Sequence, residues 1–126
     1  MPEAVAQKLF ERCGIRYMEA YGMTEAISQT HMNPPHELRK QCLGIPTFDT
    51  SATVIDPDTM LELGPNETGE IIVAGPQLML GYWEREDANN ESFINIDGDR
   101  FFRTGDLGSF DEDGFFYISD RIKRMI

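Results

Sequence analysis

The sequence predicts an α+β protein that is mainly β: a small distorted antiparallel β-barrel or sheet, with an N-terminal helix-strand piece of an α/β subdomain beside it. The 126 residues suit one compact domain, and 40% of them are apolar, which can fill a modest core. An amphipathic helix pattern opens the chain. From residue 51 onward, short runs of β-branched and aromatic residues alternate with turn residues, as in small barrels and twisted sheets.

The N-terminal part predicts one helix, one strand and a long loop. Glu3 after Pro2 is a favourable helix start, and Gly14 stands where a left-handed cap ends a helix. Residues 15–20 predict a short strand. Residues 21–41 are so rich in turn formers that we expect a loop without regular structure, and long ordered loops are usually functional.

The remainder predicts short strands separated by turns. Strand-like apolar runs occupy residues 51–56, 60–63, 70–74, 93–96, 100–103, 107–110 and 115–119. A brief helix is expected over residues 84–92, and the acidic turn 111–114 would join the last two strands as a hairpin. The change of texture near residue 43 divides the chain into 1–42, the end of an α/β subdomain, and 43–119, a β-barrel subdomain.

Charge and cysteine content limit the function classes. With 22 acidic against 11 basic residues, the net charge of −11 repels phosphate backbones and anionic lipid headgroups. We therefore expect neither nucleic acid nor a membrane surface as a partner, and no apolar run approaches the roughly 18 residues that span a bilayer. The two cysteines are too few for a disulfide framework, which predicts a cytoplasmic protein.

Two patterns have a metal-site alternative. The acidic hairpin imitates part of a calcium loop at Ser109, Asp111, Asp113, Gly114 and Asp120. However, serine takes the first ligand position, aspartate replaces the bidentate glutamate of the twelfth, and the flanking residues are strand-like, so a solvated turn is the favoured interpretation. His31 and His36 have no partner at a metal-ligand spacing, so zinc is not expected.

Two short stretches carry candidate ligand-binding groups. Residues 21–25, YGMTE, follow the predicted strand and combine a glycine for close backbone approach, a threonine hydroxyl and a glutamate with hard oxygens for a divalent ion. In residues 104–106, TGD, the aspartate could bind a ligand, but aspartate after glycine often only caps a turn. From the residues alone, both stretches keep a purely structural alternative.

Four motifs occur in order along nearly the whole chain: YGMTEA at 21–26, GEIIVAGPQLMLGYW at 69–83, FFRTGDLG at 101–108 and GFFYISDRIKRMI at 114–126. Their order and spacing resemble the adenylate-forming, or AMP-binding, superfamily. This superfamily comprises acyl-CoA synthetases, peptide-synthetase adenylation domains and luciferases. Within it, SQTHMNPP at 28–35, residues 44–59 and the ending SDRIKRMI resemble fatty-acyl-CoA ligases most.

The resemblance implies roles for the matching residues. Glu25 would hold the magnesium of MgATP and Thr24 would hydrogen-bond the α-phosphate, which makes these two the catalytic candidates. Asp106 would accept hydrogen bonds from both ribose hydroxyls, and Arg121 would reach the ribose or a phosphate. Each charge-assisted bond to Asp106 would contribute about 1.5 to 3 kcal/mol.

The remaining matches are Tyr21 beside the adenine, Gly22 and Met23 along the substrate carboxylate, and Lys123 at the hinge, within 120–126, about which a C-terminal domain swings. Other matching residues are assigned to packing and turns: Gly69, Gly75, Gly81, Tyr82 and Trp83.

The activity implied by the resemblance is that of an acid–thiol ligase. A carboxylate, here of a fatty acid, attacks the α-phosphorus of ATP to give an acyl-adenylate and pyrophosphate, and the acyl group then passes to the thiol of coenzyme A. ATP, Mg²⁺, coenzyme A and a small carboxylic acid are therefore the implied cofactors and partners. Two alternatives remain open: an adenylation domain that loads a carrier protein, and a non-catalytic β-rich interaction module.

Two parts of the family pattern are missing from the sequence. No Ser/Thr/Gly-rich phosphate loop precedes YGMTE, and no C-terminal domain with its catalytic lysine follows residue 126. We therefore expect a piece of a longer synthetase that is inactive alone. Its exposed faces would favour homo-oligomers.

Overall fold

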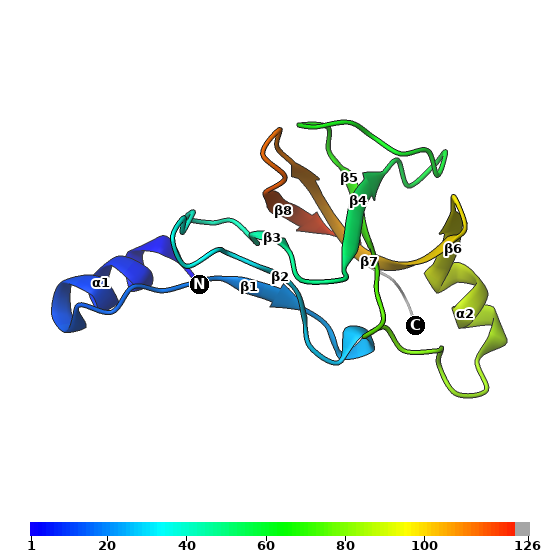
Figure 1. Ribbon diagram of the computed structural model, residues 1–126, viewed down its shortest axis with the longest axis horizontal. Helices are drawn as coiled ribbons and strands as arrows, with labels where there is room; N and C mark the ends of the chain where they lie inside the picture. Colours follow the sequence, from blue (N-terminus) through cyan, green and yellow to red (C-terminus); the bar gives the residue numbers. More distant parts are fainter. Residues whose placement is uncertain (123–126) are drawn as a thin grey trace.

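The chain folds into two antiparallel sheets and two α-helices within residues 1–122, the part that the computed structural model describes (Figure 1). In chain order the elements are α1 (Glu3–Cys13), β1 (Ala20–Gly22), the 3₁₀ helix η1 (Thr24–Ala26), β2 (Gln29–Met32), β3 (Ile45–Pro46), β4 (Ser51–Ile55), β5 (Gly69–Ala74), α2 (Glu86–Ser92), β6 (Phe93–Ile96), β7 (Asp99–Phe110) and β8 (Phe116–Arg121). The prediction of a mainly β protein is confirmed. The two helices lie at opposite ends of the molecule.

Both predicted helices are confirmed, and α1 begins and ends where local chemistry directs. The carbonyl of Pro2 accepts the backbone N–H groups of Val5 and Ala6 at 3.1 and 3.2 Å. Gly14 has a left-handed φ of 66°, which glycine adopts without steric cost, and its N–H donates to the carbonyl of Phe10 at 2.9 Å. Across residues 1–122, no helix has the length and apolar character needed to cross a membrane.

The larger sheet is organised around β7. Its strand order is β4-β5-β7-β6, and β8 also pairs with β7. β6 pairs with residues 99–102 and β8 with residues 106–110, so successive halves of one 12-residue strand serve two neighbours. The described strands do not close into a barrel. Of the two predicted forms, the antiparallel sheet is confirmed.

The central strand β5 is buried along its whole length, as its apolar run predicts. Successive side chains of a strand point to opposite faces of the sheet. Ile71 and Val73 accordingly join one apolar cluster, whose other buried members are Val54, Phe102 and Phe116. Ile72 and Ala74 join a second cluster with Ile55 and Phe101. The sheet therefore carries an apolar cluster on each face.

Several predicted elements of the N-terminal half are wrong. The strand expected at 15–20 begins only at Ala20, and the segment 21–41 is no unstructured loop because it contains η1 and β2. β2 is polar in sequence, yet Thr30 and His31 are buried since β2 pairs with β1 on one side and with β3 on the other. The strand expected at 60–63 forms only one bridge, to Ile55. Tertiary pairing here outweighs local strand preference.

The strand β7 replaces two predicted strands and the corner between them. Residues 100–103 and 107–110 are continuous, and residues 104–106 lie inside the strand as a bulge rather than a turn. The register with β5 shifts opposite the bulge, between Glu70 and Ile72. Gly105 adopts a φ of 74° there, a conformation that glycine tolerates.

Residues 43 and 44 connect the smaller sheet to β8. The N–H of Leu43 donates to the carbonyl of Phe116 at 2.8 Å, and the N–H of Phe116 donates to the carbonyl of Gly44 at 2.9 Å. A Cβ on Gly44 would lie 2.2 Å from the carbonyl carbon of Met32, so no larger residue fits. The division of the chain at residue 43 stays a prediction.

His31 on β2 is buried without a full set of polar partners. Its ring packs edge-on against Tyr21 and Phe116, with centroids 5.7 and 4.6 Å away. Nδ1 lies 3.0 Å from Oγ1 of Thr30, whereas Nε2 has no hydrogen-bond partner within residues 1–122. Burial lowers the pKa of His31 to about 4, because the charged imidazolium loses its hydration.

This histidine should make the fold sensitive to acid. The folded-state pKa lies below the unfolded value of 6.5, so the stabilising contribution of neutral His31 is present above pH 6.5 and is lost as the pH falls through 4. We expect this loss to reach about 3 kcal/mol of unfolding free energy. Urea unfolding at stepped pH values measures it, and the His31→Phe variant should show a flatter dependence between pH 7 and pH 4. A change at the exposed His36 to glutamine serves as control. Equal slopes for wild type and His31→Phe would contradict the assignment.

Candidate functional site

Three of the predicted site residues meet at the carboxylate of Asp106. The hydroxyl of Tyr21 on β1 donates to Oδ2, and Nε of Arg121 on β8 forms an ion pair with Oδ1 at 3.1 Å. Asp106 is only 5% exposed, whereas the Arg121 side chain is 79% exposed. Burial, followed by the bond to Asp106, raises the pKa of Tyr21 far above its ordinary value of 10, so its hydroxyl remains a donor.

A buried glutamate on β5 sets the backbone that carries Asp106. Oε1 of Glu70 accepts the N–H of Gly105 at 3.1 Å, and Oε2 accepts Nη2 of Arg103 at 2.7 Å. The hydroxyl of Thr104 donates to the carbonyl of Ile71 at 2.6 Å. These bonds hold the bulge of β7. The sequence analysis missed Glu70, which is fully buried. The available signal was its position as the one charged residue of GEIIVA, at the start of the apolar run.

Asp106 opens onto a shallow cleft of about 360 Å³. The side chains around it are Tyr21, Asp106, Ile118, Ser119, Asp120 and Arg121. Asp106 and Arg121 are opposite one another in the ladder of β7 and β8, which places acid and base on the same side of the hairpin. Three strands, β1, β7 and β8, therefore build the cleft, and its Tyr21–Asp106 contact joins residues that are 85 positions apart in the chain.

Gly22 and Met23 have contacts that account for their residue types. A Cβ on Gly22 would lie 2.8 Å from the carbonyl oxygen of Ser28 and from Cα of Gln29, so the approach of β1 to β2 requires glycine. The Met23 side chain packs against the larger apolar cluster of the sheet. These contacts anchor the YGMTE segment.

Glu25 lies on η1 and is held by Met79 and by Tyr82, a residue that the sequence analysis assigned to packing and turns. Its Oε1 accepts the hydroxyl of Tyr82 at 2.8 Å, and its backbone carbonyl accepts the N–H of Met79 at 2.7 Å. Within residues 1–122, Oε2 accepts no hydrogen bond, and no polar contact joins Glu25 to Asp106. The neighbouring Thr24 is exposed. The tyrosine hydroxyl in GYW was the signal that could have pointed to this contact.

The donor set at Glu25 fits a magnesium ion that arrives with phosphate. Among the described residues, no group of three or more His, Cys, Asp or Glu side chains could hold a metal. Mg²⁺ keeps several waters and is commonly bound by one or two carboxylates together with substrate phosphates. Glu25, half-buried and with one oxygen available, supplies such a carboxylate.

In the acidic turn 111–114, the carboxylate of Asp111 binds a guanidinium and backbone N–H groups. Oδ1 of Asp111 accepts the N–H groups of Asp113 and Phe115, both at 3.0 Å. Its Oδ2 accepts Nη1 of Arg39 at 2.7 Å and the hydroxyl of Tyr117 at 3.2 Å. The Arg39 guanidinium also stacks 3.6 Å from the ring of Phe115. The turn therefore fastens the segment around residue 39 to the hairpin.

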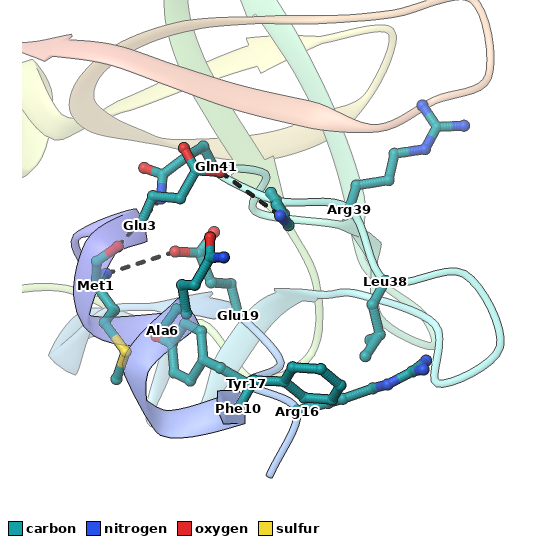
Figure 2. Close-up of a pocket in the computed structure, with 12 residues that line it drawn as sticks. Met1, Glu3, Ala6, Phe10, Arg16, Tyr17, Glu19, Leu38, Arg39 and Gln41 are labelled. Atoms are coloured by element: carbon teal, nitrogen blue, oxygen red, sulfur yellow. Dashed lines mark hydrogen bonds and ion pairs between the residues drawn. The ribbon is translucent and has the colours of Figure 1, made fainter. Parts of the chain in front are cut away.

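A second cavity, of about 450 Å³, lies between α1 and residues 38–41, with Arg39 among the residues that line it (Figure 2). Phe10, Tyr17 and Leu38 provide its apolar wall. Within residues 1–122, none of the predicted site residues lines it. The predicted hinge residue, Lys123, lies outside the described residues.

Comparison with known proteins identifies the family of the chain. The family described as AMP-binding enzyme matches residues 1–83, which include YGMTE and GYW. The chain belongs to this AMP-binding enzyme family. It is 41% identical over 124 residues to the long-chain-fatty-acid–CoA ligase of Salmonella typhimurium, covering 97% of this chain and 21% of that protein.

Solved structures agree on the fold of this AMP-binding chain. A long-chain-fatty-acid-CoA ligase from Archaeoglobus fulgidus aligns with a TM-score of 0.91 and 39% identity, over 98% of this chain and 27% of that one. The O-succinylbenzoate coenzyme A synthetase of Bacillus subtilis, solved in complex with ATP and magnesium ion, aligns with a TM-score of 0.80 and 35% identity, over 96% and 24%. The chain thus spans about a fifth of the length of the curated relatives it matches.

Proposed function

We propose that this chain forms the ribose-side part of the nucleotide site in an ATP-dependent acid–thiol ligase. The enzyme converts a carboxylic acid, here a fatty acid, into its acyl-CoA through an acyl-adenylate. The observation that carries the proposal is the meeting of Tyr21, Asp106 and Arg121 at one cleft in an AMP-binding chain. The names of the similar proteins, long-chain-fatty-acid–CoA ligases among them, support the substrate class.

In this proposal Asp106 accepts the two ribose hydroxyls. A carboxylate offers about four lone-pair sites, so the hydroxyls can join or replace the donors that Tyr21 and Arg121 now provide. Arg121 is exposed enough to swing toward a phosphate. The Tyr21 ring, held by β1, would lie beside the adenine.

Glu25 and Thr24 are proposed to act at the phosphates. Glu25 would bind the Mg²⁺ that accompanies ATP, and the ion would neutralise phosphate charge as the anionic carboxylate approaches. The exposed hydroxyl of Thr24 would donate to the α-phosphate. The chain's part in catalysis is positioning and charge neutralisation rather than covalent chemistry.

By itself, the chain is expected to show no ATP–pyrophosphate exchange. Arg121 is the one basic residue among those that line the described cleft, and stabilising the charge that develops during adenylyl transfer and pyrophosphate release needs more positive charge than one exposed guanidinium supplies. Exchange measured with radiolabelled pyrophosphate, palmitate and the purified chain tests this. A rate above the enzyme-free background would contradict it.

The proposed function is tested by transplanting the chain. We expect the Salmonella ligase to keep fatty-acid-dependent ATP–pyrophosphate exchange when its matching segment is replaced by this sequence. Exchange that depends on an aryl acid and not on palmitate would correct the substrate class. A folded chimera without any exchange would overturn the proposal, and the alternative of a non-catalytic β-rich module would gain support. Loading of a carrier protein instead of coenzyme A would favour the other alternative.

The cytoplasm is the proposed location, supported by two free cysteines, Cys13 and Cys42. Homo-oligomers through exposed faces also remain a proposal, supported by large apolar side chains that are almost fully exposed: Phe48, Leu80 and Trp83.

A further inference from the structure

Glu25 has little in its own segment to fix its side chain. Glu25 is the middle residue of a three-residue 3₁₀ helix. Ile27, which directly follows this helix, has a φ of 63° and is 83% exposed. A glutamate side chain carries large rotamer freedom, which must be removed before it can hold an ion in one place. The group that removes it comes from another part of the chain.

That group is Tyr82, 57 residues away. Its hydroxyl donates to Oε1 of Glu25 at 2.8 Å, while the Glu25 carbonyl accepts the N–H of Met79 at 2.7 Å. The segment 79–82 thus contacts both the backbone and the carboxylate of Glu25. Oε2 is left as the oxygen that accepts no hydrogen bond within the described chain.

Tyr82 is in turn fixed by α2. Asn89 accepts the N–H of Tyr82 through Oδ1 at 2.7 Å and donates from Nδ2 to the Tyr82 carbonyl at 3.1 Å, a two-point clamp on one residue. A Cβ on the preceding Gly81 would lie 2.9 Å from Nδ2 of Asn89, so glycine is needed for this approach. A continuous chain of contacts therefore runs from the helix through Tyr82 to Glu25.

We propose that Tyr82 is a positioning residue for the Glu25 carboxylate, with Asn89 as its support: the phenol fixes Oε1 and keeps Oε2 available to the cation of the nucleotide. This inference rests on the proposed function for its last step, the binding of Mg²⁺ by Glu25. Its first step, the tether between Tyr82 and η1, does not depend on that function.

The tether is tested by amide hydrogen exchange on the chain. In Tyr82→Phe, the amide of Met79 should exchange at least several-fold faster than in the wild type, because its acceptor is on the released segment, while the amide of Val73 in β5 should be unchanged. Tyr17→Phe is the matched control, since it removes the same hydroxyl from a residue of the other cavity. Unchanged protection of Met79 would overturn the tether.

The positioning role is tested in the chimeric Salmonella ligase that carries this sequence. Tyr82→Phe and Asn89→Ala should each raise the Mg²⁺ concentration for half-maximal exchange by roughly 10-fold, with a smaller change in the KM for the fatty acid. In a Glu25→Gln background, Tyr82→Phe should have little further effect. Faster Met79 exchange with an unchanged Mg²⁺ requirement would overturn the positioning role alone. If the chimera with the unchanged sequence shows no Mg²⁺-dependent exchange, the proposed function is overturned as well, whereas the tether is judged by hydrogen exchange alone.

Discussion

Replacing Glu70 by alanine is expected to lower the free energy of unfolding by about 3 to 5 kcal/mol. Glu70 is fully buried, and its carboxylate accepts two bonds from Arg103, at 2.7 and 3.1 Å. Removing it leaves the guanidinium of Arg103, only 17% exposed, without its counter-charge. It also takes the acceptor away from the N–H of Gly105 in the bulge.

Urea unfolding, monitored by circular dichroism, measures this change in the free energy of unfolding. Glu70→Gln should lie between alanine and the wild type, because an amide oxygen can still accept the N–H of Gly105 although the charge is gone. Glu91→Ala, at an exposed position of α2, is the matched control and should change stability by no more than about 0.5 kcal/mol. A loss below about 1 kcal/mol for Glu70→Ala would show that Arg103 finds another partner or water.

The second large effect is expected at Asp106, where alanine should weaken nucleotide binding by about 100-fold or more. Two charge-assisted bonds to ribose hydroxyls, each contributing about 1.5 to 3 kcal/mol, would be lost together. The same substitution removes the partner of the Tyr21 hydroxyl and of Arg121, so the cleft itself would also relax. This prediction depends on the proposed function, in contrast to that for Glu70.

Isothermal titration of the chimeric ligase with a non-hydrolysable ATP analogue measures the loss. Asp58→Ala, an exposed aspartate in a turn outside the cleft, is the control and should bind as the wild type does. 2′,3′-Dideoxy-ATP sharpens the test: it should bind wild type and Asp106→Ala almost equally, because it has no ribose hydroxyls to lose. A variant that prefers ATP over the dideoxy analogue as strongly as the wild type would exclude Asp106 as the ribose acceptor.

Much of the fold could be predicted because it is encoded by neighbouring residues. Gly14 ends α1 through its own backbone conformation, and the turn 111–114 closes through bonds within a few residues. The uninterrupted apolar run of β5 predicts a buried strand, and every position of β5 is buried in the structure. The failures share a cause. β2 looks like a polar loop until β1 and β3 pair with it, and TGD looks like a corner until Glu70 accepts the N–H of Gly105 inside a continuous strand.

The candidate site likewise has residues that the sequence could identify and residues that it could not. Sequence motifs singled out Tyr21, Glu25, Asp106 and Arg121, but they left Glu70 unnoticed and assigned Tyr82 to packing. Glu70 contacts Arg103 and Gly105 across 33 and 35 positions, and Tyr82 contacts Glu25 across 57 positions. The tyrosine of GYW offers a hydroxyl donor, but its neighbours in the chain do not indicate that the partner of this hydroxyl lies on η1.

The sequence by itself therefore determined the family, the helices, the buried strand and the residue types offered to a nucleotide. Only the tertiary structure decided which of those groups meet: Tyr21 with Asp106 across 85 residues, and Glu25 with Tyr82. The physical reason is that capping, turn formation and apolar periodicity act over a few residues. A hydrogen bond between distant side chains exists only after the strands that carry them have paired.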